Sequence, residues 1–362
     1  FSDETWEYEG GITNAWTNRN PSGTKPTPRI NFGMAYDSKN KKTILFGGRD
    51  NTGYSIQTWA YDYNTNLWSP KANGPYRAEG PCMVYDSMSY KIILFGGQTP
   101  DRVGGYSDET WTYDYSTNSW TQWYPSSRPS GRYNSACVFD SYNNKLILYG
   151  GENADGYLDD TWSYDLITNT WIQKSTSSTS TGRANMGYSF DTITRTMVIF
   201  GGDWASGGVN DETWTYHLGI NQWTRRSPSI KPSARYLTAM TYMKIDKNSF
   251  LFGGQPLSGQ PLNDNWVYRY HGTITGYTDC AGYPAPGVKI TATNSRGTYI
   301  TFTDDGGFYT MDVEGGYTYR ITPSKTGYKN WQPPYADRYV EDGAVMVQSF
   351  SATQCPLKPP GS

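Results

Sequence analysis

Histidine and cysteine carry much of the acid–base, nucleophilic and metal chemistry of proteins, and this sequence is poor in both. It contains two histidines, His217 and His271, and four cysteines in 362 residues. Serine–histidine or cysteine–histidine catalysis needs a histidine base beside the nucleophile, and these two histidines stand in different parts of the chain. No phosphate-binding loop, dinucleotide fingerprint or zinc-ligand spacing occurs. The sequence therefore assigns no catalytic residue, no metal site and no cofactor.

A series of arginines recurs along the chain together with a series of mostly acidic residues. The arginines are Arg29, Arg77, Arg132, Arg183 and Arg235. The partner series stands two positions before a repeated tryptophan and consists of Glu4, Gln57, Glu109, Asp160, Glu212 and Asp264. A guanidinium binds a carboxylate through two parallel hydrogen bonds, so such pairs would clamp neighbouring strands. Because the series recurs in every repeat, we interpret it as a structural arginine ring, with an anion-binding ring as the alternative.

Aromatic residues of the variable loops are a more specific indication of a binding surface, because the repeat does not dictate them. They are Tyr54, Tyr76, Tyr106, Trp123, Tyr124, Tyr157 and Trp204. Aromatic faces stack on sugars and anchor protein partners. The alternative is that these rings only pad the loops against strand edges. One loop, around Asn153 and Asp155, also gathers oxygen ligands that suit a cation, but we interpret it as a solvated turn.

An internal repeat of about 50 residues sets the elements that position these side chains. A Gly-Gly pair follows an apolar run at 47–48, 96–97, 150–151, 201–202 and 253–254. One tryptophan series stands at Trp6, Trp59, Trp111, Trp162, Trp214 and Trp266, and a second at Trp16, Trp68, Trp120, Trp171 and Trp223. Each repeat predicts four short strands. Strand a opens at the arginine, strand b ends at Gly-Gly, strand c contains the first tryptophan and strand d the second.

The hydrophobic pattern of these strands predicts how the sheets stack. The b strands are continuous apolar runs such as TILF before Gly47 and KIILF before Gly96, which must be covered on both faces. Four-stranded sheets with neighbours on both sides stack radially as a β-propeller. Asparagines such as Asn66 and Asn118 stand in the c–d turns, where a left-handed backbone is needed. The b–c and d–a connections, the arginines and the loop aromatics then share one face.

Residues 1 to about 271 resemble the kelch-repeat family. The arginine opening, the double glycine after an apolar strand, the Tyr-Asp pair and the closing tryptophan stand in register in five repeats. The resemblance implies an all-β fold with a kelch β-propeller. The strands amount to five full repeats plus a partial N-terminal c–d unit around Trp6 and Trp16, so we expect five or six blades. The histidine that the family often has in strand a is absent.

The closure of this ring is left open by the strand pattern. The last repeat ends after its c strand at Trp266, so an N-terminal strand could supply its d strand, yet the N-terminus also brings a c strand around Trp6. A c–d hairpin alone would leave an exposed strand edge. Three interpretations follow: an upstream segment has been removed, five blades close with an irregular extra strand, or terminal strands pair with a neighbouring copy.

A second domain is predicted where the repeat ends, at 272–355, followed by a tail at 356–362. Its strands are expected at about 273–277, 287–294, 298–303, 308–313, 317–323 and in AVMVQSFSA near the end. The segment is similar to the carboxypeptidase regulatory-like, transthyretin-like β-sandwiches, through Pro286-Gly287-Val288, the stretch from Thr303 to Tyr309, and Gly327-Tyr328. This resemblance implies a small, non-catalytic accessory β-sandwich.

The four cysteines divide into two pairs with different expectations. Cys280 follows the first strand of the second domain and Cys355 closes its last strand, so we predict a disulfide worth about 4 kcal/mol in the loop-entropy model. Cys82 and Cys137 stand in a strands of consecutive repeats. Counted from their arginines they coincide, but counted to the following Asp they differ by one, which would turn them to opposite faces. Buried free thiols are the default expectation, and the sequence leaves open whether the two are paired.

Composition narrows the classes of partner. Lys plus Arg total 31 against 33 Asp plus Glu, a net charge of −2, so no field attracts nucleic acid or an anionic membrane. No apolar run approaches the about 20 residues that span a bilayer. The N-terminal FSDETW lacks the features of a signal peptide, which was therefore absent or removed. Low charge, 32 Tyr, 14 Trp and the bracketing cysteines favour an extracellular or cell-surface protein.

The function that these observations favour is non-enzymatic. We expect a secreted structural, adhesion or filament-forming protein whose kelch propeller is an interaction scaffold for protein partners or copies of itself, assembling by strand exchange. The alternative is a carbohydrate-binding or carbohydrate-active kelch enzyme, related to galactose oxidase or to sugar isomerases, with an accessory sandwich. A copper site of the galactose oxidase kind needs two histidines, and His217 and His271 are not expected to meet on the propeller axis. An intracellular adaptor is disfavoured because no helical oligomerisation domain accompanies the repeats.

Overall fold

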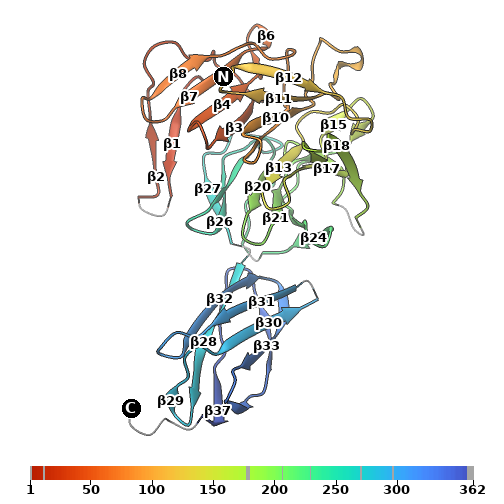
Figure 1. Ribbon diagram of the computed structural model, residues 1–362. Helices are drawn as coiled ribbons and strands as arrows, with labels where there is room; N and C mark the ends of the chain where they lie inside the picture. The colour runs from red at the N-terminus through yellow and green to blue at the C-terminus, as the bar shows by residue number, and fades with distance from the viewer. Residues whose placement is uncertain are drawn as a thin grey trace. The chain divides into compact units, whose positions relative to one another are not determined.

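The computed structural model describes residues 2–10, 13–176, 180–205, 207–228, 230–269, 271–295 and 297–356. The chain divides into two compact units, Phe1–Trp266 and Val267–Ser362, and both are all-β (Figure 1). The helical element among the described residues is the short 3-10 turn η1 (Val103–Gly105), and none of these residues forms a helix suited to crossing a membrane.

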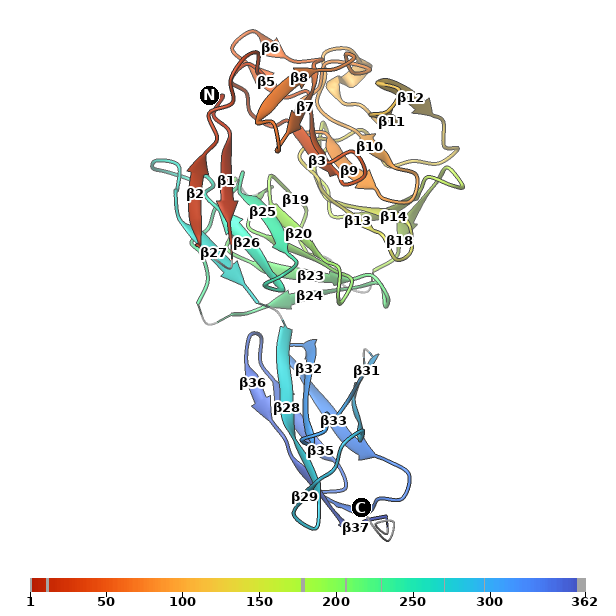
Figure 2. The ribbon, with the colours of Figure 1, turned by 60° about the vertical axis from the view of Figure 1, so that its left-hand side comes forward.

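Five antiparallel sheets, which we call blades 1 to 5, build most of the first unit (Figures 1 and 2). Each begins with its innermost strand, and these strands line a common central cleft. Blade 1 consists of β3 (Gly33–Asp37), β4 (Lys42–Phe46), β7 (Thr58–Asp62) and β8 (Leu67–Pro70), and blade 2 of β9 (Cys82–Asp86), β10 (Lys91–Phe95), β11 (Thr110–Asp114) and β12 (Ser119–Trp123). Blade 3 consists of β13 (Ala136–Asp140), β14 (Lys145–Tyr149), β17 (Thr161–Asp165) and β18 (Thr170–Lys174), and blade 4 of β20 (Gly187–Asp191), β21 (Thr196–Phe200), β23 (Thr213–His217) and β24 (Gln222–Arg226). Blade 5 consists of β25 (Ala239–Met243), β26 (Asn248–Phe252) and β27 (Asn265–Tyr268).

Four two-stranded pieces complete the propeller unit. Three of them decorate the loops: β5 (Arg49–Asp50) with β6 (Gly53–Tyr54), β15 (Glu152–Asn153) with β16 (Gly156–Tyr157), and β19 (Arg183–Ala184) with β22 (Asp203–Trp204). The fourth is an N-terminal hairpin of β1 (Trp6–Glu9) and β2 (Ala15–Asn18), which lies between blades 5 and 1 in both ribbon views (Figures 1 and 2). Blade 5 has three strands in the order β25-β26-β27, so the N-terminal hairpin does not supply its outer strand.

Local sequence explains the two turns that every complete repeat shares. In the c–d turn, asparagines adopt the left-handed backbone that the sequence predicts, with φ of 56° at Asn66 and 49° at Asn118. At the end of strand b the double glycine lets the chain pass close to its neighbour. Gly47 has a φ of 71°, and a Cβ there would lie 2.6 Å from the carbonyl oxygen of Ala78. The repeat therefore keeps glycine where any side chain would collide with backbone.

A disulfide joins blades 2 and 3, which corrects the expectation of free thiols. Cys82 and Cys137 are bonded, with their Cα atoms 5.8 Å apart, in the inner strands β9 and β13. The one-residue offset between them is the reason. Cys82 is the first residue of its strand and Cys137 the second, so they point to opposite faces of their own sheets and meet between two adjacent sheets. The one-residue offset that argues against a disulfide in the sequence is therefore what allows Cys82 and Cys137 to meet.

The second unit consists of two sheets around one core, as the sequence predicts. One sheet contains β28 (His271–Cys280), β29 (Tyr283–Pro284), β32 (Phe308–Glu314), β34 (Lys329–Gln332), β36 (Val345–Val347) and β37 (Phe350–Gln354), and the other β30 (Lys289–Asn294), β31 (Gly297–Phe302), β33 (Tyr317–Ser324) and β35 (Ala336–Val340). Buried residues of both, such as Ile274, Val313 and Ile321, form the core. Cys280 and Cys355 form the expected disulfide. Of the tail expected at 356–362, residues 357–362 lie outside the described residues.

Candidate functional site

Buried arginines form a set of clamps on the loop face of blades 1, 3, 4 and 5. Each lies at the start of strand a and donates from Nη1 to the carbonyl of the first glycine of the Gly-Gly pair in its own blade. These bonds are Arg29 to Gly47 at 2.9 Å, Arg132 to Gly150 at 3.1 Å, Arg183 to Gly201 at 3.2 Å and Arg235 to Gly253 at 3.0 Å. The four arginines are 0–5% exposed. Each clamp ties strands a, b and c of one blade together.

The partners of these arginines come from the start of strand c. Arg132 pairs with Asp160, Arg183 with Glu212 at 2.8 Å, and Arg29 with Gln57 at 2.6 Å. Burial raises the pKa of Asp160, but hydrogen bonding and charge from Arg132 outweigh burial and leave this pKa below its usual value. Asp160 belongs to the loop in which a cation was considered, and its carboxylate is already engaged.

Blade 2 builds the same clamp from different residues. Arg77 is exposed and pairs with Asp101 at 2.5 Å, so it lies outside the set of buried arginines. The buried hydroxyl of Tyr76 donates instead to the Gly96 carbonyl at 2.7 Å. Arg102 reaches the strand-c carboxylate, with its Nε 2.6 Å from Oε1 of Glu109. The spacing from Arg77 to the following Tyr-Asp pair is one residue longer than in the other blades, and this turns Arg77 outward. Tyr76 then binds the glycine carbonyl and Arg102 binds the strand-c carboxylate in its place.

The structure separates the loop aromatics that the sequence singles out. Tyr76 is buried, and the half-buried Trp123 donates to Thr112 Oγ1 at 3.0 Å, so both serve their own blade. Tyr124 is 74% exposed and bonds its neighbour Gln122. The remaining four are half-buried on the loop face: Tyr54, Tyr106, Tyr157 and Trp204.

Two carboxylates share the loop face with Tyr106 and Tyr157. Glu152 and Asp203 each follow the double glycine of their blade, in blades 3 and 4. Burial is the main cause that raises the pKa of both carboxyls, and the charge of Asp203 raises the pKa of Glu152 further. Burial and these carboxylates also raise the pKa of Tyr157 to about 12. The rings of Tyr106 and Tyr133 lie 5.8 Å apart in a tilted arrangement.

Sequence reasoning missed Glu152, Asp203 and Tyr133. The hydroxyl of Tyr133 donates to Glu152 at 3.0 Å, and the amide of Asn185 donates to both oxygens of Asp203 at 3.1 Å. The available signal was that the residue after Gly-Gly changes from repeat to repeat: it is Arg49, Gln98, Glu152, Asp203 and Gln255. Over the described part of the chain, no three His, Cys, Asp or Glu residues are grouped to hold a metal ion.

The N-terminal hairpin has the contacts of a c–d strand pair in a sixth blade. The rings of Tyr8 and Trp16 lie 5.1 Å apart, as do Tyr113 and Trp120 in blade 2. In complete blades the d-strand tryptophan also packs on the aromatic residue that ends strand b of the preceding blade, and Trp16 packs in this way on Phe252 of blade 5 at 4.6 Å. The hairpin therefore follows blade 5.

The hairpin also precedes blade 1. The indole of a d-strand tryptophan donates to the threonine before the c-strand tryptophan of the previous blade, as Trp171 does to Thr110 at 3.0 Å. Trp68 of blade 1 donates in the same way to Thr5 at 3.0 Å. The outer half of the ring is thus closed from blade 5 through the hairpin to blade 1. We call this place the sixth position.

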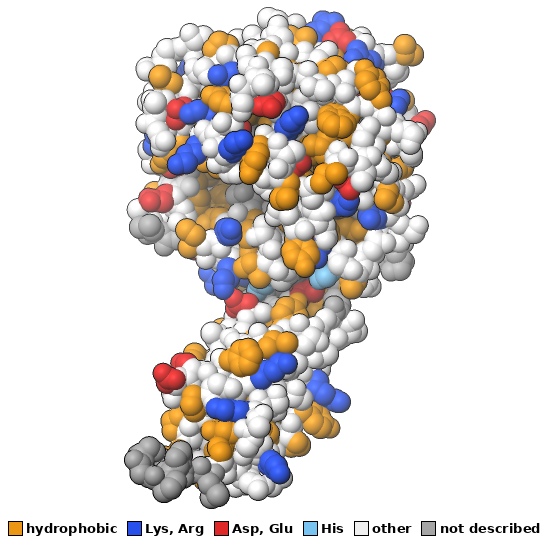
Figure 3. Space-filling view, in the orientation of Figure 1, with side chains coloured by type: hydrophobic (Ala, Val, Ile, Leu, Met, Phe, Trp, Pro, Cys, Tyr) orange, Lys and Arg blue, Asp and Glu red, His pale blue; other side chains and the backbone are white. Residues whose placement is uncertain are grey.

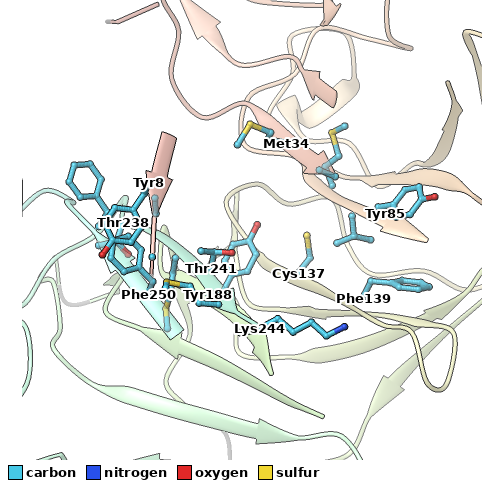
Figure 4. A pocket seen from close by; sticks show the side chains of 18 of the residues that line it. Tyr8, Met34, Tyr85, Cys137, Phe139, Tyr188, Thr238, Thr241, Lys244 and Phe250 are labelled. Atoms are coloured by element: carbon cyan, nitrogen blue, oxygen red, sulfur yellow. The ribbon is translucent and has the colours of Figure 1, made fainter. Parts of the chain in front are cut away.

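The inner half of the sixth position is open and continuous with the central cleft. The whole space, lined by the inner strands of all five blades and by the hairpin, has a volume of about 870 Å³, and a hollow is visible in the surface (Figure 3). In Figure 4, Tyr8 lies beside Phe250 on one side of it and Met34 lies across the open space. Met34 of β3 lines this space and is 55% exposed, and Tyr36, two residues further along the strand, is 54% exposed. We call the part of this space that lies between blade 5 and blade 1 the sixth-position cleft. It occupies the place that strands a and b fill in the other blades.

This architecture defines the class of the first unit as a β-propeller with radially stacked four-stranded sheets. The family model described as the KLHDC2/KLHL20/DRC7 Kelch-repeats domain matches residues 4–126 and 82–273. The chain belongs to this kelch-repeat family. A solved structure entitled "Structure of YjhT" superimposes with a TM-score of 0.60 at 15% identity, covering 74% of this chain and 88% of that one. This likeness concerns the fold.

Proposed function

We propose that this chain is a secreted, non-enzymatic structural or adhesion protein whose kelch propeller binds partners at the sixth position. The observation that carries the proposal is the sixth-position cleft, where apolar faces of two blades and one edge of β1 meet solvent. Among the described residues, β1 pairs with β2 only. Kelch propellers are interaction scaffolds, and an unpaired edge beside an apolar groove is the arrangement that takes up an added strand.

The disulfides support an extracellular place for the protein. The chain has two disulfides, Cys82–Cys137 in the propeller and Cys280–Cys355 in the second unit, and all four of its cysteines are used. Disulfides persist in oxidising compartments and are rare in the cytosol. We further propose, from its resemblance to carboxypeptidase regulatory-like modules, that the second unit is an accessory domain. Adhesion and filament building would then depend on the propeller.

Site-specific photo-crosslinking tests the proposed binding place. A benzophenone amino acid at Met34 would lie in the sixth-position cleft, and one at Ile167 would lie on a c–d turn where the side chain is 78% exposed. The labelled chain is incubated with the extracellular fraction of the producing cells and adducts are sequenced by mass spectrometry. We expect a defined adduct from Met34 and none from Ile167. Absence of an adduct at Met34, or the same adducts at both positions, would overturn the proposal.

A second candidate function, carbohydrate binding, is favoured by the loop-face cluster of Tyr106, Tyr157, Glu152 and Asp203. Aromatic faces and partly buried carboxylates are the groups that bind sugar rings and their hydroxyls. A glycan array with the intact chain and with Glu152→Gln and Asp203→Asn tests it. A glycan bound by the intact chain and lost in both variants supports this function. No bound glycan, or binding that persists in both variants, rejects it.

A further inference from the structure

Each blade carries a short extension of its sheet on the loop face, and in blade 3 this extension places three side chains in a row. Tyr133 is paired with Glu152, the residue after Gly-Gly, and Glu152 is paired with Tyr157 of the returning b–c loop. Residues that lie directly opposite each other in antiparallel strands point to the same side of the sheet. The carboxylate of Glu152 therefore has a phenol ring on either side of it.

Blade 4 places a second carboxylate beside this row. Asp203 follows the Gly-Gly pair of blade 4 and is paired with Ala184 and Val209, which are small where blade 3 has its two tyrosines. Burial raises the pKa of Asp203, and hydrogen bonds from Asn185 and Tyr157 only partly offset this effect. The hydroxyl of Tyr157 thus reaches from blade 3 to the carboxylate of Asp203 in blade 4.

Neither carboxylate has a positively charged partner among the residues that the structure describes. Glu152 accepts a hydrogen bond from the neutral hydroxyl of Tyr133 at 3.0 Å. Asp203 accepts two from the neutral amide of Asn185, each at 3.1 Å. Burial and the charge of Asp203 raise the pKa of Glu152, and no lysine or arginine of the described chain counteracts them. A half-buried carboxylate in this state is unfavourable, because its charge has lost water without gaining a cation.

Other half-buried carboxylates on the loop face show how the chain compensates such a charge. Glu109 in blade 2 is bound by Arg102, with 2.6 Å between Oε1 and Nε. Asp160 in blade 3 is bound by Arg132. Burial raises the pKa of both carboxyls, but the arginines outweigh burial and leave both pKa values below their usual values. The loop-face cluster lacks this compensation, so its counter-charge is expected from a ligand.

Aromatic rings give the loop-face cluster a second kind of contact. The rings of Tyr106 in blade 2 and Tyr133 in blade 3 lie 5.8 Å apart in a tilted arrangement, and both side chains are half-buried. Tyr157 is half-buried as well. An aromatic face packs against the C–H face of a sugar ring and also attracts a cation. A ligand that uses the rings and the carboxylates together has a flat apolar face and a positively charged group at its edge.

We propose that the loop-face cluster binds a sugar with a free, protonated amino group, whose ammonium supplies the counter-charge for Glu152 and Asp203 while its pyranose ring packs against the tyrosines. This inference rests on the carbohydrate-binding function proposed above and specifies its ligand class. A neutral or N-acetylated sugar keeps the ring contacts but leaves the two carboxylates uncompensated. A lysine side chain supplies the ammonium but has no pyranose face for the rings.

Three trisaccharides test the ligand class, because they share one cellulose-type backbone and differ only in the substituent next to the anomeric carbon. Triglucosamine carries an ammonium there, triacetylchitotriose an acetamide and cellotriose a hydroxyl. Each is titrated into the intact chain in a calorimeter at a pH of about 6, where amines are protonated and most carboxyls are ionised. We expect triglucosamine to bind at least about tenfold more tightly than either of the other two.

Matched variants of the protein locate the binding. Glu152→Gln and Asp203→Asn should each weaken triglucosamine binding at least about tenfold and remove its advantage over cellotriose. Asp155→Asn, at an exposed carboxylate in the b–c loop of blade 3, controls for the change in net charge and should leave binding unchanged. Tyr157→Ala removes a ring and should weaken every trisaccharide that binds. Glu152→Gln and Asp203→Asn should melt no lower than the intact chain, because each removes an uncompensated charge.

Three results would overturn the inference. One is binding of cellotriose or triacetylchitotriose as tight as that of triglucosamine, and if Glu152→Gln and Asp203→Asn abolish it, carbohydrate binding still stands. The second is displacement of triglucosamine by an equal concentration of a trilysine peptide, because the site would then recognise an ammonium without a sugar. The third is no binding of any trisaccharide, after which the glycan array decides whether carbohydrate binding fails as well. The failure of the ligand class and the failure of the proposed function are therefore distinguishable.

Discussion

Met34 and Met83 hold the same position in the inner strands of blades 1 and 2, but their surroundings are opposite. Met83 is 5% exposed and lies against Gly33 of the preceding blade, whereas Met34 is 55% exposed and faces the sixth-position cleft. Residue type, strand position and backbone are the same in both cases. The preceding blade alone decides which methionine is core and which is surface.

The same contrast separates the closed and open faces of the ring. Between blades 2 and 3, Cys82 and Cys137 are joined covalently. Beside the sixth position, Ala239 holds the place of Cys82 and is exposed. The outer half of the sixth position nevertheless has the same tryptophan contacts as a complete blade. This propeller is therefore closed by its outer strands and open at its inner ones.

Removing a clamp from a complete blade should have the largest effect, because it makes that blade resemble the sixth position. Arg132→Ala leaves Asp160 in blade 3 without a guanidinium, as Glu4 is now. Breaking a buried pair from one side costs about 3–5 kcal/mol of the free energy of unfolding, measured in guanidinium chloride. Arg77→Ala, at an exposed pair, should cost about 0–1 kcal/mol. Equal costs for the two arginines would contradict the distinction between the clamp and the surface pair.

The two methionines provide a matched test of the comparison itself. Met83→Ala should lower the free energy of unfolding by about 2–5 kcal/mol, because it leaves a cavity between blades 1 and 2. Met34→Ala should change it by about 0.5 kcal/mol or less. Denaturant unfolding of both variants checks this. If Met34→Ala were as costly as Met83→Ala, the cleft would be closed in solution.

Features fixed by short-range signals could be predicted from the sequence, and features fixed by neighbouring sheets could not. The b strands, the Gly-Gly turns and the asparagine turns at Asn66 and Asn118 follow from local patterns and were found. The Cys82–Cys137 bond depends on which faces of two sheets meet, and counting residues within one repeat did not reveal that. In the second unit, β34 and β35 were missed because KNWQ and ADRYV are polar segments without the alternation of a half-buried strand.

In the candidate site, too, features set by local sequence could be predicted and features set by neighbouring sheets could not. The arginine and acid series marked the clamps, but the spacing from arginine to the following Tyr-Asp is one residue longer in blade 2, and this shift is what turns Arg77 outward. The sequence predicts the partial c–d unit around Trp6 and leaves its placement open. Only the contacts of Trp16 and Trp68 place it between blades 5 and 1.

Lowering the pH should destabilise the complete blades because it protonates clamp carboxylates such as Asp160, whereas Glu4 at the sixth position should not contribute to this loss of stability. The pKa of Asp160 is lower in the folded protein than in the unfolded chain, so its ionised form stabilises the fold above the unfolded value of about 4, and this stabilisation disappears as the pH falls through the folded value. Arg132→Ala should therefore reduce the loss of stability between neutral pH and pH of about 3. Glu4→Gln should leave that loss unchanged. An unchanged loss in Arg132→Ala would contradict the assignment.

The smallest expected change in the free energy of unfolding concerns the tryptophan–threonine hydrogen bonds, which show whether the outer half of the sixth position is as stable as a complete blade. Thr110→Val removes the acceptor of the buried Trp171 indole and should cost about 1 kcal/mol, and Thr5→Val removes the acceptor of the half-buried Trp68 and should cost about 0.5 kcal/mol. Denaturant unfolding measures both. A measurable cost at Thr5 means that the N-terminal hairpin is held from blade 1 as well as from blade 5, so both outer walls of the sixth-position cleft are fixed. No cost at Thr5 would mean that the N-terminal hairpin is attached to blade 5 alone, so that the wall on the side of blade 1 is not fixed.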